Sequence, residues 1–143
     1  MITFKRGAAW AVLAVVLGSG FFSGAAMAAD KPATRVFEMR TYYTLPGRLE
    51  ALQKRFREHT LRIFEKHGMT NVGYWVPQDE PARSNTLIYV ISHASREQAK
   101  ANWAAFIADP EWKKVAEESQ KDGKIIEKIE SVFMDAADYS PIK

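Results

Sequence analysis

The residues best suited to acid–base chemistry in this sequence are its histidines, His59, His67 and His93. An imidazole changes its charge near neutral pH, so a histidine in a cavity can act as a general base or orient a ligand. At roughly 100° per residue, His59 and His67 fall on the side of one predicted helix that carries its apolar stripe. His59 is therefore the main candidate for a base. The alternative is a histidine at the edge of the stripe that bonds a backbone carbonyl.

The other chemically active side chains have simpler interpretations. His67 falls in the last turn of the same helix, where an imidazole interacts favourably with the helix dipole. His93 precedes a predicted helix cap and is expected in a surface loop. Glu38 and Arg40 share one face of the first predicted strand. We expect them to pair across a dimer seam or, as the less favoured interpretation, to orient an anionic substrate.

Metal and cofactor chemistry find little support in these residues. His59 and His67 are eight positions apart, roughly 12 Å along a helix axis, so they cannot chelate one ion. The sequence contains no Cys, no H-x-x-x-H or H-E-x-x-H spacing, no glycine-rich phosphate loop and no serine nucleophile elbow. We predict no metal and no cofactor.

The elements that must position these residues follow from hydrophobic periodicity and caps. Between positions 49 and 67 apolar residues recur at steps of three and four, which predicts a long helix that Gly68 ends. Ser95 and Gln98 have capping-box spacing, and Asp109 before a proline marks another helix start. The predicted order is strand 35–43, helix 46–67, strand 70–76, a polar loop at 77–84, strand 85–92, helices 96–109 and 111–121, and strand 125–134.

This order is that of the split βαβ or ferredoxin-like fold, an α+β class in which a four-stranded antiparallel sheet carries helices on one face. The other face normally meets water, so the strands should alternate between apolar and polar residues. The third strand instead has an unbroken apolar run at positions 87–91. We therefore predict that a second copy covers that face and that the pair forms a dimeric α+β barrel. The alternative is a monomer with an exposed apolar patch.

Residues 1–28 have the pattern of a secretory signal peptide. Two basic residues precede an apolar run, and small residues follow it before position 29. An uncleaved membrane anchor is the alternative, but about 15 apolar residues are short for a span that needs about 20. We predict cleavage after Ala28, a linker at 29–34, a domain at 35–143 and a periplasmic or secreted protein without stable membrane insertion.

The charge balance argues against nucleic acid as a partner. The full chain carries a formal charge of +3, and its leader contains Lys5 and Arg6 but no acidic residue, so the mature chain carries +1. No cluster of basic residues remains on one stretch, which removes the electrostatic basis for binding nucleic acid. The absence of Cys also excludes disulfides and thiolate catalysis.

Several short motifs follow one another along the chain. They are Val-Phe-Glu-Met-Arg-Thr-Tyr at 36–42, Leu-Pro-Gly at 45–47, Phe56-x-x-His59, His67-Gly68, Val72-Gly73-x-Trp75 and Asp109-Pro-Glu-Trp112. As an ordered set they resemble the NIPSNAP family over roughly 36–133. The resemblance implies the dimeric α+β barrel, which the strand argument reaches independently. The chain departs from the family in the loop before Asn85, which lacks an expected glycine, and at the helix start Ser-Arg-Glu-Gln, where an acid–Arg pair is usual.

The resemblance leaves the function open, because the family is poorly defined functionally. Its animal members are mitochondrial and linked to trafficking and organelle quality control, roles that do not fit a protein with an export leader. In related barrels that carry out catalysis the pocket lies between the helices and the sheet. This implies His59 as the catalytic residue with Trp75 as a wall of its pocket, and His67 and Tyr42 as further ligand-binding residues.

We expect an exported homodimer that binds a small apolar or aromatic ligand or a protein partner. One alternative is a cofactor-independent monooxygenase or isomerase in which His59 polarises or deprotonates a phenolic substrate. Another is a haem-binding protein with His59 or His67 as axial ligand. An enzyme requires His59 to open onto a lined cavity, so full enclosure of His59 by Phe56 and Ile63 would exclude catalysis. A binding protein requires only the cavity, and an interaction protein requires neither.

Overall fold

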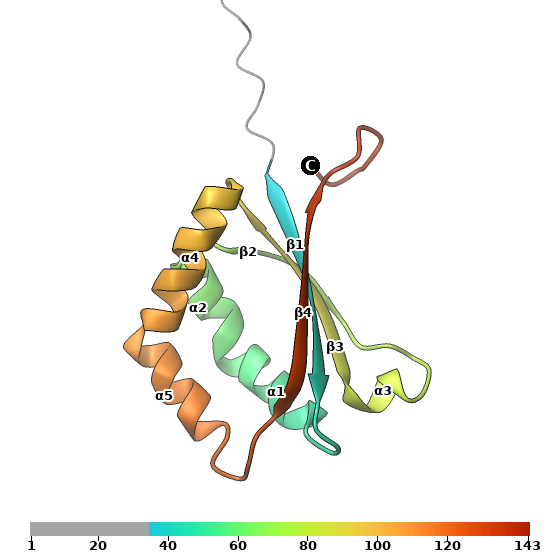
Figure 1. Cartoon of the computed structure of the whole chain (residues 1–143), viewed down its shortest axis with the longest axis vertical. Coiled ribbons are helices and arrows are strands. Elements are labelled where there is room, and N and C mark those ends of the chain that lie inside the picture. Colours follow the sequence, from blue (N-terminus) through green and yellow to red (C-terminus); the bar gives the residue numbers. More distant parts are fainter. Residues whose placement is uncertain (1–34) are drawn as a thin grey trace, which may run out of the picture.

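The computed structural model describes residues 35–143, which form a layer of strands and a layer of helices (Figure 1). The predicted signal peptide at 1–28 and linker at 29–34 lie outside the described residues. Within the described range no helix has the length and apolar character needed to cross a membrane. In chain order the elements are β1 Val36–Thr44, α1 Leu49–Arg55, the π-helical turn η1 Phe56–Thr60, α2 Leu61–Lys66, β2 Thr70–Trp75, α3 Ala82–Asn85, β3 Thr86–His93, α4 Arg96–Ala108, α5 Pro110–Glu118 and β4 Ile126–Asp135.

The strands form one four-stranded antiparallel sheet in the order β2-β3-β1-β4. Helices α1, α2, α4 and α5 cover one face of it, whereas the short helix α3 lies at the end of the sheet (Figure 1). This arrangement confirms the predicted α+β class and the ferredoxin-like order of elements. The bounds predicted for each strand lie within one residue of the observed bounds.

The first helical segment, made of α1, η1 and α2, contains a feature that the sequence pattern did not reveal. At η1 the amide N–H of Leu61 donates to the carbonyl of Phe56, five residues back. A π turn inserts an extra residue and rotates every later position around the helix axis. Thr60 therefore takes the buried position on the sheet side, and His59 turns toward α5. The prediction that His59 faces the sheet is wrong.

Local signals in the sequence set the helix ends. At the start of α4 the Ser95 side chain accepts a hydrogen bond from the amide of Gln98 at 3.0 Å. At the start of α5 Asp109 Oδ1 accepts from the amide of Glu111 at 2.7 Å. Both predicted N-terminal caps are thus confirmed. Gly68 follows α2 with φ of 74°, a left-handed conformation that favours glycine and ends the helix.

Aromatic side chains fill much of the space between the sheet and the helices. Phe56 and Phe64 of the first helical segment meet Tyr89 of β3 with ring centroids 5.1 and 6.0 Å apart. Phe106 of α4 packs on Phe64 at 4.9 Å. The predicted apolar stripe is therefore buried against the sheet through tilted aromatic pairs, which have a favourable geometry. The other buried apolar residues of this core are Tyr42, Leu49, Leu52, Ile63, Met69, Leu87, Ile91 and Ile125.

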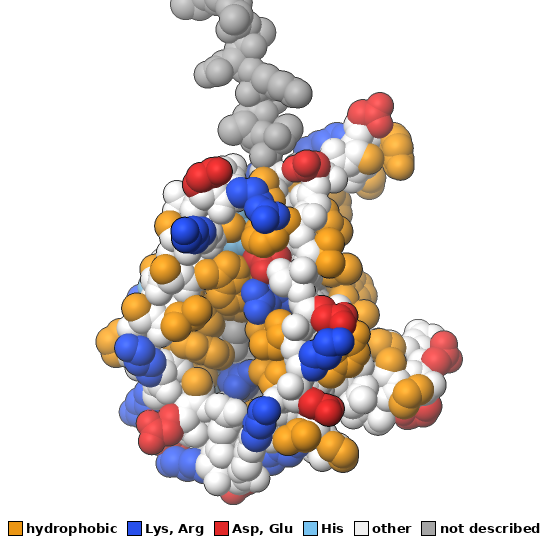
Figure 2. Space-filling model, viewed as in Figure 1, with side chains coloured by type: hydrophobic (Ala, Val, Ile, Leu, Met, Phe, Trp, Pro, Cys, Tyr) orange, Lys and Arg blue, Asp and Glu red, His pale blue; other side chains and the backbone are white. Residues whose placement is uncertain are grey.

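The sheet face away from the helices, here called the open face, is apolar at its centre. Met39 of β1 lies between its partners Val90 of β3 and Val132 of β4. Val132 is 50% exposed, and no helix among the described residues covers this face (Figure 1). Hydrophobic side chains are visible along the side of β4 that faces away from the helices (Figure 2). Because Tyr89 and Ile91 of β3 are buried in the core while Val90 lies on the open face, both faces of β3 are apolar, as predicted.

A β-bulge in β2 decides which of its residues share a face. Simple alternation would place Val72 with Tyr74. The register of β2 against β3 shifts before Gly73, however, and Val72 lies on the same side as Trp75. Tyr74 stacks on Tyr89 at 5.4 Å on the helix side. The bulge thus gathers Val72 and Trp75 at one place on the open face.

Candidate functional site

A fully buried carboxylate, that of Glu38, lies between the sheet and α4. Its Oε1 accepts hydrogen bonds from Arg40 Nη1 at 2.8 Å and from Ser131 Oγ at 2.7 Å. Its Oε2 accepts from Trp103 Nε1 at 2.7 Å and lies 3.1 Å from His93 Nε2. These four partners come from β1, β4, α4 and β3, so one carboxylate joins three strands to a helix. We call these five residues the Glu38 cluster.

The surroundings of Glu38 keep it ionised. Burial by itself raises the pKa of a carboxyl, but hydrogen bonds from His93, Ser131 and Trp103 and the charge of Arg40 lower the pKa of Glu38 to about 2. A carboxylate that already accepts four hydrogen bonds has no proton to donate near neutral pH. The Glu38 cluster is therefore a polar anchor of the fold rather than an acid–base centre.

The Glu38–Arg40 pair also corrects an expectation from the sequence. The Arg40 guanidinium lies 4.2 Å from the ring centre of Trp103, which belongs to α4, so the pair faces the helices. A pair on this side cannot cross a dimer seam formed by the open face. The prediction that these two residues pair across such a seam is therefore wrong.

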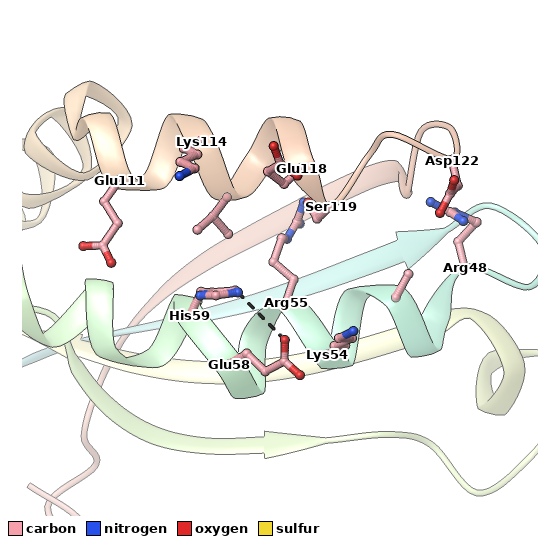
Figure 3. Close-up of a pocket in the computed structure, with 12 residues that line it drawn as sticks. Arg48, Lys54, Arg55, Glu58, His59, Glu111, Lys114, Glu118, Ser119 and Asp122 are labelled. Atoms are coloured by element: carbon pink, nitrogen blue, oxygen red, sulfur yellow. Dashed lines mark hydrogen bonds and ion pairs between the residues drawn. The ribbon is translucent and has the colours of Figure 1, made fainter.

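A groove with a volume of about 550 Å³ lies between α5 and the α1–η1 part of the first helical segment (Figure 3). His59 lies on its wall with a side chain that is 43% exposed, and its Nε2 is 3.9 Å from the Glu58 carboxylate. Phe56 and Ile63 are buried in the core and do not enclose it. His59 thus opens onto a lined groove, and the condition that would exclude catalysis is not met.

Charged side chains line most of this groove, and Arg55 is the most deeply buried of them, at 5% exposed. Within the described part of the chain its Nη1 donates one long hydrogen bond of 3.4 Å to Ser119 Oγ, and its Nε has no partner. The ring of Trp112 lies 5.4 Å from the guanidinium carbon. Burial lowers the pKa of Arg55 because the charged form is poorly solvated. The remaining lining residues are Arg48, Ala51, Lys54, Glu58, Glu111, Lys114, Val115, Glu118 and Asp122.

A second cavity, of about 440 Å³, lies on the open face beneath the C-terminal segment 136–142. The indole of Trp75 lines it together with other apolar side chains. Trp75 and His59 are therefore on opposite sides of the sheet. The prediction that Trp75 lines the same pocket as His59 is wrong. The apolar residues around the cavity are Phe37, Val72, Val90, Met134, Pro141 and Ile142.

Gly73 allows the indole of Trp75 to lie close to the backbone of β2. A Cβ added at Gly73 would be 2.5 Å from Trp75 Cη2, so any larger residue displaces the ring. We expect Gly73→Ala to change the free energy of unfolding by less than about 1 kcal/mol, because the ring is half-exposed and can swing away. The emission of Trp75 should shift as its surroundings change. The measurement is fluorescence together with urea unfolding.

The Trp75 signal is isolated by subtracting the spectrum of Trp75→Phe from that of the parent protein, and the spectrum of the double variant from that of Gly73→Ala. Identical difference spectra would contradict the claim that Gly73 allows the indole of Trp75 to lie close to the backbone of β2. A loss of stability well above 1 kcal/mol would contradict the small change that we expect, because it would mean that the ring cannot move.

His67 joins two helices rather than lining a cavity. Its Nε2 lies 2.6 Å from Asp109 Oδ2, which also accepts from Lys66 Nζ at 2.7 Å. These contacts, with Lys66 the stronger and His67 the next, hold the pKa of the Asp109 carboxyl well below its usual range. His67 therefore ties the end of α2 to the start of α5. Haem coordination through His67 Nε2 would break this contact. Among residues 35–143 no group of three or more His, Asp or Glu side chains is placed to hold a metal ion.

Tyr42 belongs to the aromatic core. Its hydroxyl accepts a hydrogen bond from the Tyr89 hydroxyl at 3.1 Å, and its ring meets Phe56 edge-on at 5.9 Å. It is not among the residues that line the groove or the cavity. Of the residues predicted for one site, the structure thus places His59 in the groove, Trp75 in the cavity, and Tyr42 and His67 in neither.

His93 was expected in a surface loop, and that prediction is wrong. It is the last residue of β3 and is fully buried, because Glu38 provides a partner for its imidazole. The sequence held a signal for this cluster. Glu38 shares a strand face with Tyr42, and a face that carries a core tyrosine turns its acid toward the core as well. A buried acid requires hydrogen-bond donors nearby, and His93 and Trp103 supply them.

The fold defines a ferredoxin-like α+β protein with one uncovered sheet face, and comparisons with known proteins give it a family. The NIPSNAP family model matches residues 37–141, so the chain belongs to the NIPSNAP family. A NIPSNAP family protein of unknown function from Agrobacterium tumefaciens str. C58 is 25% identical over 78% of this chain and 96% of that chain, with a TM-score of 0.66. An uncharacterised NIPSNAP-like domain protein from Burkholderia xenovorans is 16% identical over 76% and 90%, also with a TM-score of 0.66. A search of curated proteins gave no match.

Proposed function

We propose that this NIPSNAP protein is an exported homodimer that holds a small apolar or aromatic ligand. The observation that carries the proposal is the uncovered apolar open face, which includes the cavity lined by Trp75. In this arrangement two copies pack sheet to sheet, as in other two-layer packings, and the packing shields the cavity from water.

A second copy is the occupant that suits this face best. Met39, Val90 and Val132 form an apolar centre, and contiguous exposed apolar surface marks interaction sites. The helices of residues 35–143 lie on the other face or at the end of the sheet, so they leave this face free (Figure 1). A two-fold axis through the patch would match it to itself, which is the commonest interface of homodimers. A different protein partner is the competing occupant.

The chemistry of the cavity favours a ligand with an apolar or aromatic body. Its volume of about 440 Å³ lies in the range of small-molecule sites. The indole of Trp75 offers a flat surface on which an aromatic ring can pack. Asp135 and Tyr139 stand among the lining residues and can orient a polar group of the ligand.

Native mass spectrometry of the purified exported protein tests ligand binding. We expect the mass of two chains plus a small molecule that is lost on denaturation. Trp75→Ala should lose the small molecule and remain a dimer, whereas Trp103→Phe, in the core on the other side of the sheet, should retain it. A dimer of unmodified mass in every preparation would contradict ligand binding and favour a protein partner.

Export rests on the pattern of residues 1–28. A basic start, an apolar run and small residues before position 29 are the features by which secretory leaders are recognised and cleaved. We infer cleavage after Ala28 and a periplasmic or secreted protein. The intact mass of protein from a periplasmic extract should correspond to a chain that begins at Ala29. A chain that begins at Met1 and sediments with membranes would contradict this.

His59 supports a second candidate function, base catalysis, because it opens onto the groove. A base must reach the proton that it removes, and such assistance contributes about 10²–10⁴-fold to a rate. The exported protein would be incubated with a panel of phenols in air-saturated buffer while oxygen uptake and absorbance are followed. Turnover that falls by about 100-fold in His59→Asn would support the candidate. Equal turnover in both proteins, or none in either, would contradict it.

A further inference from the structure

Beyond the ligand of the open face, we propose that the groove between α1–η1 and α5 binds the oxyanion group of a small ligand, a carboxylate or a phosphate, on the guanidinium of Arg55. The groove lies on the helix side of the sheet and the Trp75 cavity lies on the open face. The two sites are therefore separate, and each can fail without the other.

Arg55 is a buried cation without an acid. Figure 3 shows its side chain rising from the first helical segment toward Ser119 near the end of α5. Among residues 35–143 no carboxylate lies within ion-pair distance of it, its Nε is unpartnered, and its bond to Ser119 is long at 3.4 Å. A buried charge is normally paired, because desolvation without a partner is costly. An oxyanion in the groove would accept the hydrogen bonds that the protein leaves unmade.

The other charges of the groove reinforce this preference. Arg48, Lys54 and Lys114 line it, and none of them makes an ion pair with a carboxylate of the described residues. Arg48 is held at one end by a hydrogen bond from Nη2 to the Gly123 carbonyl at 2.9 Å, and its Nε is also unpartnered. Lys114 is near enough to Glu118 to lower the pKa of that carboxyl, but it makes no direct ion pair with it. An anion that enters the groove therefore meets several cations that are not in direct contact with a carboxylate.

Two of the four acids that line the groove make ion pairs with cations that lie outside it. Glu111 pairs with Arg62 and with Lys66. Glu118 pairs with Lys121 at 2.5 Å. Glu58 and Asp122 remain, and they counter only part of the positive charge. The groove thus favours a small anion over an extended polyanion, because its rim still carries acidic groups that would repel a chain of phosphates.

Isothermal titration calorimetry of the purified full-length mature protein with sodium benzoate and, separately, sodium phosphate tests the proposal. Sodium chloride at equal ionic strength removes general salt effects. We expect saturable binding of at least one anion, and the anion that binds identifies the group as a carboxylate or a phosphate. Arg55→Met should weaken that binding by about 10- to 100-fold, since hydrogen bonds to charged groups contribute that much.

Two lysines on α5 provide a matched pair of variants that does not depend on the stability of Arg55→Met. Lys114→Gln removes a cation of the groove and should weaken binding several-fold. Lys113→Gln removes its exposed neighbour outside the lining and should leave binding unchanged. Equal affinity in the parent protein, Lys114→Gln and Lys113→Gln would overturn the proposal. The absence of saturable binding of either anion to the parent protein would also overturn it. The dimer and its retained ligand in native mass spectrometry would be unaffected by that outcome, so the proposed function is judged separately.

Discussion

Replacing Glu38 with alanine is expected to lower the free energy of unfolding by about 3–5 kcal/mol, the range found when one partner of a buried ion pair is removed. The carboxylate accepts hydrogen bonds from Arg40, Trp103 and Ser131 and contacts His93, so alanine leaves these buried groups without a partner. Urea unfolding followed by circular dichroism measures the loss. Glu127→Ala, an exposed acid of β4, is the matched control and should change the free energy by less than about 0.5 kcal/mol.

The same carboxylate should give the stability a defined pH dependence. Its folded-state pKa of about 2 is below the ordinary value of 4.5, so the ionised form stabilises the fold above about pH 4.5. This contribution, about 3 kcal/mol, is lost as the pH falls from 4.5 toward 2. The glutamine in Glu38→Gln carries no titratable group, so this variant lacks the pH-dependent contribution to stability. The difference in unfolding free energy between the parent protein and Glu38→Gln should be constant at neutral pH and shrink below pH 4.5. A difference that is equal at pH 7 and pH 3 would show that the ionised Glu38 carboxylate does not stabilise the fold in this way.

Replacing Val132 with aspartate is expected to dissociate the proposed dimer. The side chain is half-exposed in one chain, so the fold of the single chain tolerates the change. In a sheet-to-sheet dimer the aspartate carboxylate would be buried in the interface without a partner, which costs several kcal/mol and weakens association by at least about 100-fold. Size-exclusion chromatography with light scattering at several concentrations measures the effect.

Ile129 provides the control for this prediction. It belongs to the same strand and is 43% exposed, but it pairs with Tyr42 and so lies on the helix side of the sheet. Ile129→Asp should leave the proposed dimer intact. If Ile129→Asp dissociated the dimer and Val132→Asp did not, the open face would not be the interface. The two copies would then make contact through the helix side of β4, at the edge of the sheet.

The fold was largely predictable because its signals are local. Each strand contains several β-branched or aromatic residues, and Ser95, Asp109 and Gly68 mark helix ends by side-chain or backbone requirements of their own. Such signals do not depend on what lies across the core. The apolar run at 87–91 also predicted correctly that both faces of β3 are apolar.

The candidate site was harder to predict because it depends on small departures from regular geometry. The π turn at Phe56–Thr60 rotates the helix that follows, and it moves His59 from the expected sheet side into the groove. The bulge before Gly73 moves Val72 to the side of Trp75. Neither inserted residue changes the spacing of apolar residues enough to be recognised in the sequence.

The Glu38 cluster was missed for another reason. Apart from Glu38 and Arg40, its members are far apart in the sequence, and the sequence offered separate interpretations for them: a strand acid paired across a dimer seam and a loop histidine. Only the pairing of β1 with both β3 and β4 brings Glu38 between His93 and Ser131. Long-range contacts of this kind are set by topology and register rather than by local pattern.

Packing of two copies through the open face can be tested by cross-linking, because this chain contains no cysteine. Val132→Cys introduces a single thiol on that face, in the edge strand β4, and Ile129→Cys introduces one on the other side of the same strand. Both proteins would be treated with a short bifunctional maleimide at micromolar concentration and analysed by denaturing electrophoresis. If two copies pack through the open face, Val132→Cys should give efficient covalent dimers and Ile129→Cys should give few. Covalent dimers from Ile129→Cys alone, or from neither variant, would contradict packing through that face.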